Sequence, residues 1–232
     1  MSGIALKRIS RDVSVLNGNE ALAKQGIYYF ANEADMSEGL ALLIGQEGTP
    51  YFGGFYYFSI KFPADYPWSP IKVKTLTQDG HTRFNPNMYK EGKVCLSILN
   101  TWHDGPQWTG IQSLESVLLV IMSDVLNANP LQNEPAFSQC GHSPEARMYN
   151  TLLWHSNVET AIVGMLVSPP PFAEGHIELM RAEFAKRRTD ILERTLAAID
   201  DNDGKLGVCR VFTMSLRYNF KGLAEKLMAI KN

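Results

Sequence analysis

The sequence predicts an α+β fold. Four β-prone segments follow one another between residues 27 and 76, and helical patterns come before and after them. Helical periodicity then continues to the end of the chain, which predicts a mainly helical C-terminal extension.

Length and composition limit the possible classes of protein. The 232 residues suffice for one large domain, or for a core domain with an extension. A net charge of −2 favours neither nucleic acid nor an anionic membrane as a partner. The most apolar run, at 117–122, is far too short to span a bilayer, and the first ten residues place charges where a signal peptide needs an apolar core. Three scattered cysteines form no disulfide framework, so we expect a reducing compartment: the cytoplasm, and also the nucleus.

The first predicted helix begins at Ser2, a residue type that caps helices well. Its apolar positions recur at helical spacing: Ile4 or Leu6, Ile9, Val13 and Leu16. The opposite face carries Lys7, Arg8 and Arg11, which on residue chemistry alone form a solvated face. A polar break is expected from Asn17 to Ala23.

The four predicted strands are Ile27–Ala31, Leu40–Ile44, Phe55–Phe62 and Ile71–Leu76. The third has aromatic residues on both faces, which is typical of a central strand. The fourth alternates apolar and polar residues, as a strand with one solvated face does. Between these two, three prolines in eight residues predict a stiff connector that exposes Trp68, and an exposed Trp indicates a contact surface.

The segment from Arg83 to Leu99 combines an irregular turn with a single cysteine. Asn85-Pro86-Asn87 is turn chemistry, and Gly92 closes a second tight turn. The alternation that follows predicts a short strand with Cys95 on the face opposite its buried residues. A lone cysteine there is by itself more typical of a small buried apolar residue.

Helical segments dominate the second half. Ser113 caps a predicted core helix from Leu114 to about Asn127, and Ser143 with Pro144 begins a helix that ends before the three prolines at 169–171. A further amphipathic run starts at Ile177. Beyond it the sequence predicts a β-prone piece at 208–214 and a last helix at 221–230.

The cysteine segment resembles the active-site signature of the ubiquitin-conjugating enzymes, the E2 family. The family pattern of His-Pro-Asn with a Cys eight positions after the Asn is matched by Pro86, Asn87 and Cys95, while Asn85 stands in the His position. The connector Phe-Pro-x-Asp-Tyr-Pro-x-x-Pro at 62–70 matches a second family string. Asn-Pro-Asn followed by Gly-Lys-Val-Cys-Leu-Ser-Ile-Leu is most similar to the long Z-type branch, which carries an extra C-terminal segment.

The resemblance implies an architecture: the UBC-like fold, a four-stranded antiparallel meander sheet flanked by helices. It divides the chain into a catalytic core at residues 1–168 and an extension at residues 169–232, packed on or next to the core. If Trp108 is the tryptophan that follows the family's cysteine, residues 102–107 form a small insertion beside the site. We expect this insertion and the basic cluster at 186–188 to adjust the choice of E1 or modifier.

The resemblance also implies an activity. Cys95 takes ubiquitin or a ubiquitin-like modifier from an E1 activating enzyme as a thioester, and a lysine of a protein substrate then attacks it with the help of an E3 ligase. A thiolate is both a good nucleophile and a good leaving group, which suits a carrier. Asn87 is expected to stabilise the oxyanion or to brace the turn, and Glu134 to lie near the thiol and assist the lysine. No cofactor and no metal are expected.

In the family, the basic face of the first helix docks the E1, and E3 ligases use part of the same region. The expected E1 and E3 surface here consists of Lys7, Arg8, Arg11, Trp68 and Gly110.

Two other readings of the cysteine remain. A non-catalytic E2-like adaptor would bind modifier or E3 without a thioester, and it would be favoured by a buried, unreactive Cys95. A cysteine hydrolase would need a histidine base. His103 is near in sequence, and geometry decides whether it serves.

Overall fold

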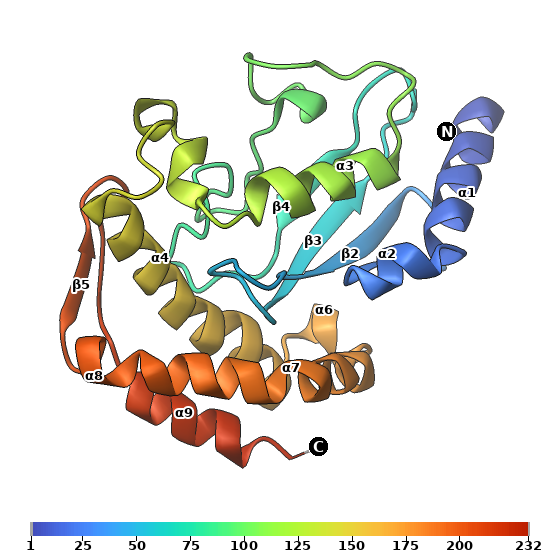
Figure 1. The fold of residues 1–232 in the computed structure, drawn as a ribbon. Coiled ribbons are helices and arrows are strands. Elements are labelled where there is room, and N and C mark those ends of the chain that lie inside the picture. Colours follow the sequence, from blue (N-terminus) through green and yellow to red (C-terminus); the bar gives the residue numbers. More distant parts are fainter. Residues whose placement is uncertain (1, 232) are drawn as a thin grey trace.

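The structure is a computed structural model that describes residues 2–231, so Met1 and Asn232, the outermost residues of the two predicted domains, lie outside it. Its main sheet has four strands, in the order β1-β2-β3-β4 with every neighbouring pair antiparallel (Figure 1). The bounds are β1 Ile27–Ala31, β2 Glu38–Ile44, β3 Phe55–Lys61 and β4 Lys72–Thr75. The predicted α+β meander is confirmed, and the aromatic strand β3 is an inner strand as expected.

The N-terminal helix α1 (Gly3–Asn17) begins where the sequence predicts, with the Ser2 hydroxyl accepting from the Ala5 N–H. Ile9 and Leu16 are buried, whereas Ile4 is 68% exposed. The polar break expected up to Ala23 is wrong in part, because Asn19 caps a further short helix, α2 (Glu20–Lys24).

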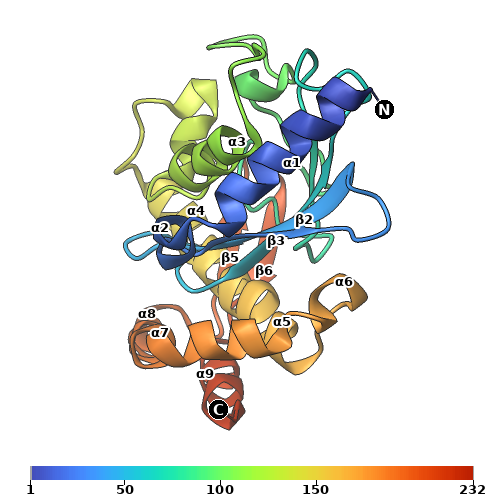
Figure 2. The same cartoon turned by 90° about the vertical axis from the view of Figure 1, so that its right-hand side faces the viewer.

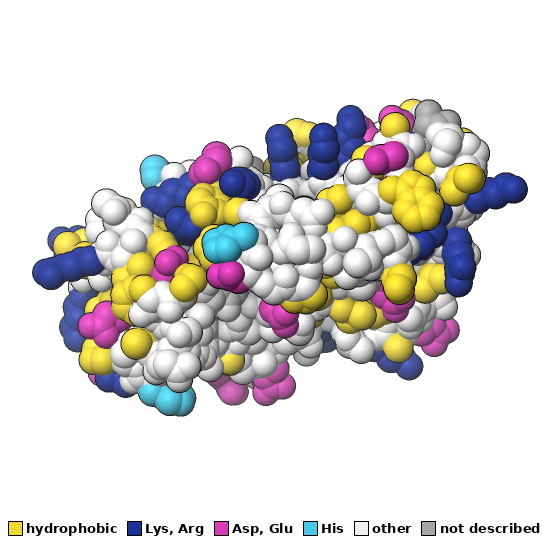
Figure 3. All heavy atoms as spheres, turned by 90° about the horizontal axis from the view of Figure 1, so that it is seen from above, with side chains coloured by type: hydrophobic (Ala, Val, Ile, Leu, Met, Phe, Trp, Pro, Cys, Tyr) yellow, Lys and Arg dark blue, Asp and Glu magenta, His cyan; other side chains and the backbone are white. Residues whose placement is uncertain are grey.

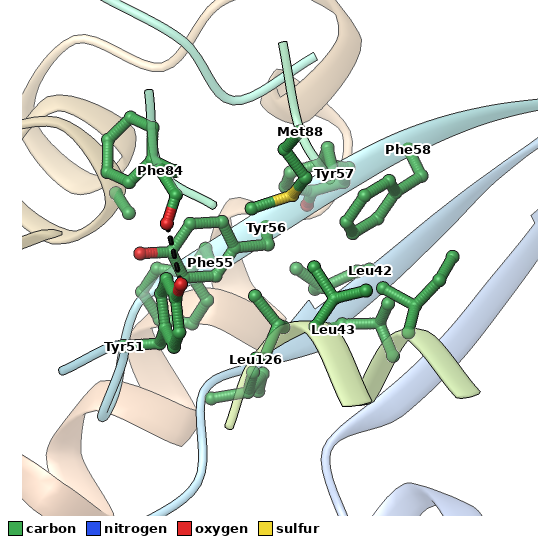
Figure 4. Packing of buried hydrophobic residues seen from close by; sticks show 14 of the residues in the cluster. Leu42, Leu43, Tyr51, Phe55, Tyr56, Tyr57, Phe58, Phe84, Met88 and Leu126 are labelled. Atoms are coloured by element: carbon green, nitrogen blue, oxygen red, sulfur yellow. Dashed lines mark hydrogen bonds between the residues drawn. The ribbon is translucent and has the colours of Figure 1, made fainter. Parts of the chain in front are cut away.

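One face of the sheet packs against buried residues from the loops and helices that follow it. Tyr56 and Phe58 of β3 lie opposite Leu43 and Ala41 of β2, so these side chains share one face. Figure 4 shows Leu43, Tyr56 and Phe58 packed with Met88 and other buried residues. Helix α3 (Leu114–Val120) covers this face and continues as a π-helical segment, Ile121–Val125.

A long helix passes the end of the sheet: α4 (Pro144–Ser156), then a π-helical segment (Asn157–Gly164), then α5 (Met165–Val167). The buried side chain of Asn157 ties it to the sheet, since its oxygen accepts from the Tyr56 hydroxyl (2.7 Å) and its amide donates to the Phe52 carbonyl (3.0 Å). The predicted start at Ser143 and Pro144 is confirmed.

The remaining elements lie beyond the face of the sheet opposite α3, packed against the long helix and against one another (Figure 2). They are α6 Pro171–Glu174, α7 Ile177–Ala197, α8 Ile199–Asn202, β5 Leu206–Cys209, β6 Met214–Arg217 and α9 Phe220–Ala229. The boundary expected at residues 168 and 169 therefore falls between α5 and α6. The single β-prone piece predicted at 208–214 is wrong: it spans the turn of an antiparallel β5–β6 hairpin.

Specific contacts hold α7 and the residue before it on the sheet. The His176 ring stacks on Phe30, with centroids 3.6 Å apart, and lies parallel to Tyr57 at 5.8 Å. Gly53 has φ +72°, and a Cβ there would come within 2.4 Å of the Ile191 side chain, so glycine allows both the turn and the close approach of α7. None of the helices within residues 2–231 is both long and apolar enough to cross a bilayer.

Candidate active site

The segment around Cys95 is a loop, so the short strand predicted there is wrong. Val94, Leu96 and Ile98 are buried as expected, but Cys95 between them is buried too, so burial does not alternate; the backbone forms isolated bridges and then a 3₁₀ turn at Ser97–Leu99. Gly92 has φ +93° and closes the predicted turn. The Thr101 hydroxyl takes the place of a partner strand, because it accepts from the Leu96 N–H at 2.8 Å.

Asn85 connects this loop to the core. It is fully buried, and its amide nitrogen donates to the Val125 carbonyl (2.8 Å) and to the Tyr51 hydroxyl (3.2 Å). Its amide oxygen accepts from the Asn87 N–H (2.8 Å) and from the Asn133 amide (3.2 Å). Asparagine in the family's histidine position thus holds the loop through four hydrogen bonds. The neighbouring Pro86 carbonyl is fixed by Arg83 at 2.6 Å.

Asn87 and Cys95 are paired across the loop. The Asn87 side-chain amide donates to the Cys95 carbonyl at 2.7 Å, and the Cys95 N–H donates to the Asn87 carbonyl at 2.9 Å. Asn87 therefore braces the turn in this structure, which is one of its two expected roles.

The cysteine itself is only 4% exposed. Its Sγ lies 3.4 Å from the Thr101 carbonyl oxygen, which accepts from the thiol. Thr101 belongs to the stretch that joins the 3₁₀ turn to Trp108. A reaction at Sγ with a bulky partner therefore requires this contact to open.

The expected insertion at 102–107 is an exposed loop that folds back on itself. The Gln107 side-chain amide donates to the Trp102 carbonyl at 3.0 Å, and the loop also touches the 3₁₀ turn, since a Cβ on Gly105 would lie 2.9 Å from Ser97 Oγ. The His103 side chain is 80% exposed and lies 3.4 Å from Asp104. No contact within residues 2–231 joins His103 to Cys95, so the geometry gives a His103 base no support.

Glu134 lies at the end of a 3₁₀ turn, Pro130–Asn133, and is partly buried. Its carboxylate makes no hydrogen bond or ion pair with any described residue. The preceding residue, Asn133, is the one that reaches the site through Asn85. The structure thus connects the Glu134 segment to the Asn87 turn, but not the carboxylate to the thiol.

Comparison with known proteins decides the family. The ubiquitin-conjugating enzyme family model matches residues 8–150, more than half of the chain. The chain belongs to the ubiquitin-conjugating enzyme family. Ubiquitin-conjugating enzyme E2 Z of Xenopus tropicalis is 42% identical over 160 residues, which cover 68% of this chain and 50% of that protein. For the Homo sapiens E2 Z the values are 39% over 180 residues, with 77% and 49% covered.

These relatives support the Z-type branch of the E2 family, and the chain spans about half of their length. A solved structure from Plasmodium yoelii, assigned to the ubiquitin-conjugating enzymes, aligns with a TM-score of 0.54 at 22% identity. It covers 69% of this chain and 97% of its own, and it bears on the fold alone.

The expected E1 and E3 surface of this E2 is partly assembled by Arg8. Its guanidinium donates to the carbonyls of Gly110 (2.9 Å) and Gln112 (2.6 Å), and Arg8 Nε pairs with the buried Asp12 at 2.9 Å. Because these internal contacts occupy Arg8, its side chain is only 22% exposed. Lys7 and Arg11 are exposed and remain the accessible cations of the face.

Trp68 lies beside Gly110, whose carbonyl accepts from Arg8. It is 74% exposed, and a Cβ on Gly110 would lie 3.5 Å from its ring. The indole N–H of Trp108 donates to the Pro67 carbonyl at 2.7 Å and so fixes the proline-rich connector that carries Trp68. Ile111, next to Gly110, is 90% exposed. Arg8, Gly110 and Trp68 thus lie together in this E2.

Three residues of the site escaped sequence reasoning: Thr101, Asn133 and Ile111. Thr101 and Asn133 act through contacts with residues distant from any recognised string, so no sequence signal pointed to them. Ile111 carried a signal, since a large apolar residue between Gly110 and Gln112 interrupts a polar loop.

Proposed function

We propose that this E2 accepts ubiquitin or a ubiquitin-like modifier from an E1 as a thioester on Cys95 and transfers it to a lysine of a protein substrate, with an E3 ligase as the usual partner. The observation that carries the proposal is the paired Asn87–Cys95 loop, which lies within the segment that matches the family.

Two acyl transfers make up the proposed reaction. The Cys95 thiolate attacks the carbonyl carbon of the modifier's thioester on the E1, and the E1 thiolate leaves. The neutral amine of the substrate lysine then attacks the new thioester, and the Cys95 thiolate leaves as the amide bond forms. The amine loses its proton in this second step. Each step passes through a tetrahedral oxyanion, which a positioned N–H donor stabilises.

Asn87 is the proposed donor. Its side-chain nitrogen has two N–H groups, and among the described residues it makes one hydrogen bond, to the Cys95 carbonyl. The second N–H is the group proposed for the oxyanion. The same side chain can therefore brace the loop and polarise the thioester without rotating away from Cys95.

Glu134 is the proposed acidic residue that orients the attacking lysine. A carboxylate beside an ammonium group favours the charged form, so it acts by alignment and by accepting the proton rather than by lowering the pKa of the lysine. Its partial burial and its lack of a described ionic partner leave the carboxylate available for this role.

The adaptor reading keeps one specific observation in its favour. Cys95 is 4% exposed, and its thiol contacts the Thr101 carbonyl. A chain that binds modifier or E3 without chemistry would have no need to open this contact. The active E2 needs the Thr101 stretch to move by enough to admit the C-terminal tail of the modifier.

A charging assay separates the two. The full chain is incubated with ATP, a panel of E1 enzymes and ubiquitin or other modifiers, and run on non-reducing gels beside Cys95→Ala. We expect a band larger by one modifier that thiol removes and that Cys95→Ala lacks. A folded protein that gains no band with any E1 and modifier would favour the adaptor. Localisation to cytoplasm and nucleus is expected as well, and imaging of a fluorescent fusion tests it.

A further inference from the structure

A cavity of about 710 Å³ lies along the edge strand β4, and we call it the β4 groove. One wall comes from β4 and the loop before it, the other from the residues that lead to and follow Cys95. Its apolar lining includes Ile71, Val73, Val94 and Leu99. The groove thus offers an apolar floor beside β4, the last strand of the sheet.

Three lysines line the β4 groove: Lys72, Lys74 and Lys93. All three are exposed, and none forms an ion pair with a described carboxylate. Lys72 and Lys74 alternate with buried residues and so share one face of β4. The backbone of Lys93 forms an isolated antiparallel β-bridge with Lys74 at the edge of β4, which brings the third lysine beside the other two. Neighbouring Lys61 differs, because Glu38 pairs with it at 2.6 Å.

This arrangement concentrates positive charge in a chain of net charge −2. Figure 3 looks down on the molecule from above, and Lys and Arg side chains stand close together along the edge at the top of that picture. One carboxylate, Glu91, also lines the groove. Like charges held side by side repel, and an incoming anion relieves that repulsion.

The groove reaches the candidate active site. Thr101 lines it, and the carbonyl of the same residue is the acceptor for the Cys95 thiol at 3.4 Å. Val94, directly before Cys95, lines it too. A chain segment lying in the groove would therefore end beside Cys95.

We propose that the β4 groove binds an acidic, extended segment of the substrate protein and so presents a nearby lysine to Cys95. The proposal rests on the proposed function and names its substrate class: lysines that lie next to runs of Asp or Glu. An apolar floor with three cations fits a peptide with mixed apolar and acidic side chains. Nucleic acid would need a longer basic track than the three lysines provide.

The first test measures binding and needs no thioester. A fluorescein-labelled peptide with one lysine and four glutamates is titrated with the full, uncharged chain in low salt and followed by anisotropy, beside the same peptide with four glutamines. We expect the glutamate peptide to bind more tightly. Lys72→Ala/Lys74→Ala/Lys93→Ala should weaken it about tenfold, since each exposed ion pair contributes a few-fold at most, and added salt should remove the difference.

The matched control removes three lysines elsewhere. Lys221→Ala/Lys226→Ala/Lys231→Ala makes the same change in net charge on and beside α9, where all three residues are exposed. It should leave the peptide affinity unchanged. Equal losses in the two triple variants would overturn the proposal, because binding would then follow net charge. Tighter binding of a single-stranded oligothymidylate than of the glutamate peptide would overturn it as well.

The second test uses the thioester. The ubiquitin-charged protein is mixed with each unlabelled peptide, and the rates of ubiquitin transfer to the peptide lysine are compared. We expect faster transfer to the glutamate peptide, with the preference lost in the groove variant and kept in the α9 variant. Equal rates for the two peptides would reject the groove and leave the E2 activity standing. Absence of any thioester would reject the activity, while anisotropy would still report on the groove.

Discussion

Asn87 and Cys95 are joined by reciprocal hydrogen bonds: the Asn87 side-chain amide donates to the Cys95 carbonyl at 2.7 Å, and the Cys95 N–H donates to the Asn87 carbonyl at 2.9 Å. A change at Asn87 therefore acts on the backbone that carries the thiol as well as on any group bound to it. Stability and chemistry have to be measured separately at this residue.

Asn87→Ala should lower the free energy of unfolding by about 1 kcal/mol, the usual value of one hydrogen bond. Transfer of modifier from Cys95 to free lysine should fall by more, roughly 100-fold, because an oxyanion donor is lost. Urea unfolding and single-turnover discharge measure the two effects. A discharge rate within a few-fold of the unchanged protein would show that Asn87 only braces the loop.

Asn85→Ala should be among the more destabilising substitutions of the loop. Asn85 is fully buried with four hydrogen bonds, so truncation leaves the Val125 carbonyl, the Asn87 N–H and the Asn133 amide without this partner. We expect a loss of about 2–3 kcal/mol in urea unfolding. The exposed Asn17→Ala, at the end of α1, is the control and should change stability by less than about 0.5 kcal/mol. Equal effects of the two would contradict the bracing role of Asn85.

The strands were predictable because each carries its own signal. Ile27–Ala31 matches β1 residue for residue, since a short aromatic, β-branched run between polar segments has few alternatives. The loop at Cys95 was not predictable as a loop, because its alternation of apolar and polar residues is typical of a strand. There the backbone groups are satisfied by the Thr101 hydroxyl and the Asn87 amide, contacts that no local pattern encodes.

Long-range packing was the second feature that could not be predicted from the sequence. That Arg8 would point at Gly110, 102 residues away, or that His176 would stack on Phe30, depends on how whole elements meet. The family string supplied Cys95 and Asn87 as candidates. It could not supply the 4% exposure of Cys95 or the contact of its thiol with the Thr101 carbonyl, because both depend on how the loop folds.

His155 should make stability fall in acid. Burial lowers its pKa from 6.5 to about 4; Asp203 opposes that shift and Lys226 adds to it. The neutral ring accepts from the Asn219 N–H through Nε2 at 3.0 Å, so the contact with Glu159 at 3.7 Å is not an ion pair at neutral pH. The unfolded chain then binds the proton more readily than the folded chain between about pH 6.5 and pH 4, and stability decreases as pH falls through this window.

The expected contribution of His155 is a loss of about 2 kcal/mol between pH 8 and pH 5. His155→Gln removes the titrating group, so its unfolding free energy should depend less on pH over this range, whatever its value at pH 8. Urea unfolding at several pH values measures both slopes. The exposed His81→Gln is the control and should keep the original slope. Identical slopes for His155→Gln and the unchanged protein would contradict the assignment.

The C-terminal extension should unfold together with the core. Phe220, at the start of α9, is fully buried and meets the His155 ring of α4 edge-on at 5.1 Å, and Arg194 of α7 lies 4.0 Å over the Trp154 ring. Phe220→Ala should cost about 3–4 kcal/mol and shift one single transition. Met228→Ala, at a residue 51% exposed on the same helix, should have little effect. Tryptophan fluorescence and far-UV circular dichroism follow the unfolding, and two separate transitions would show that the extension is independent of the core.

Replacing the sulfur of Cys95 by oxygen tests the central proposal most directly. The thiol is expected to form a thioester, which reducing agents cleave, whereas Cys95→Ser should form an oxygen ester that survives reducing gels and is cleaved by hydroxide. Cys140→Ser and Cys209→Ser are the matched controls; both side chains are free thiols in this structure, and burial raises the pKa of the Cys209 thiol. The proposal predicts a band that resists reducing agent in Cys95→Ser alone. A band that stays sensitive to reducing agent in Cys95→Ser, or a resistant band in either control, would place the modifier on another residue and contradict it.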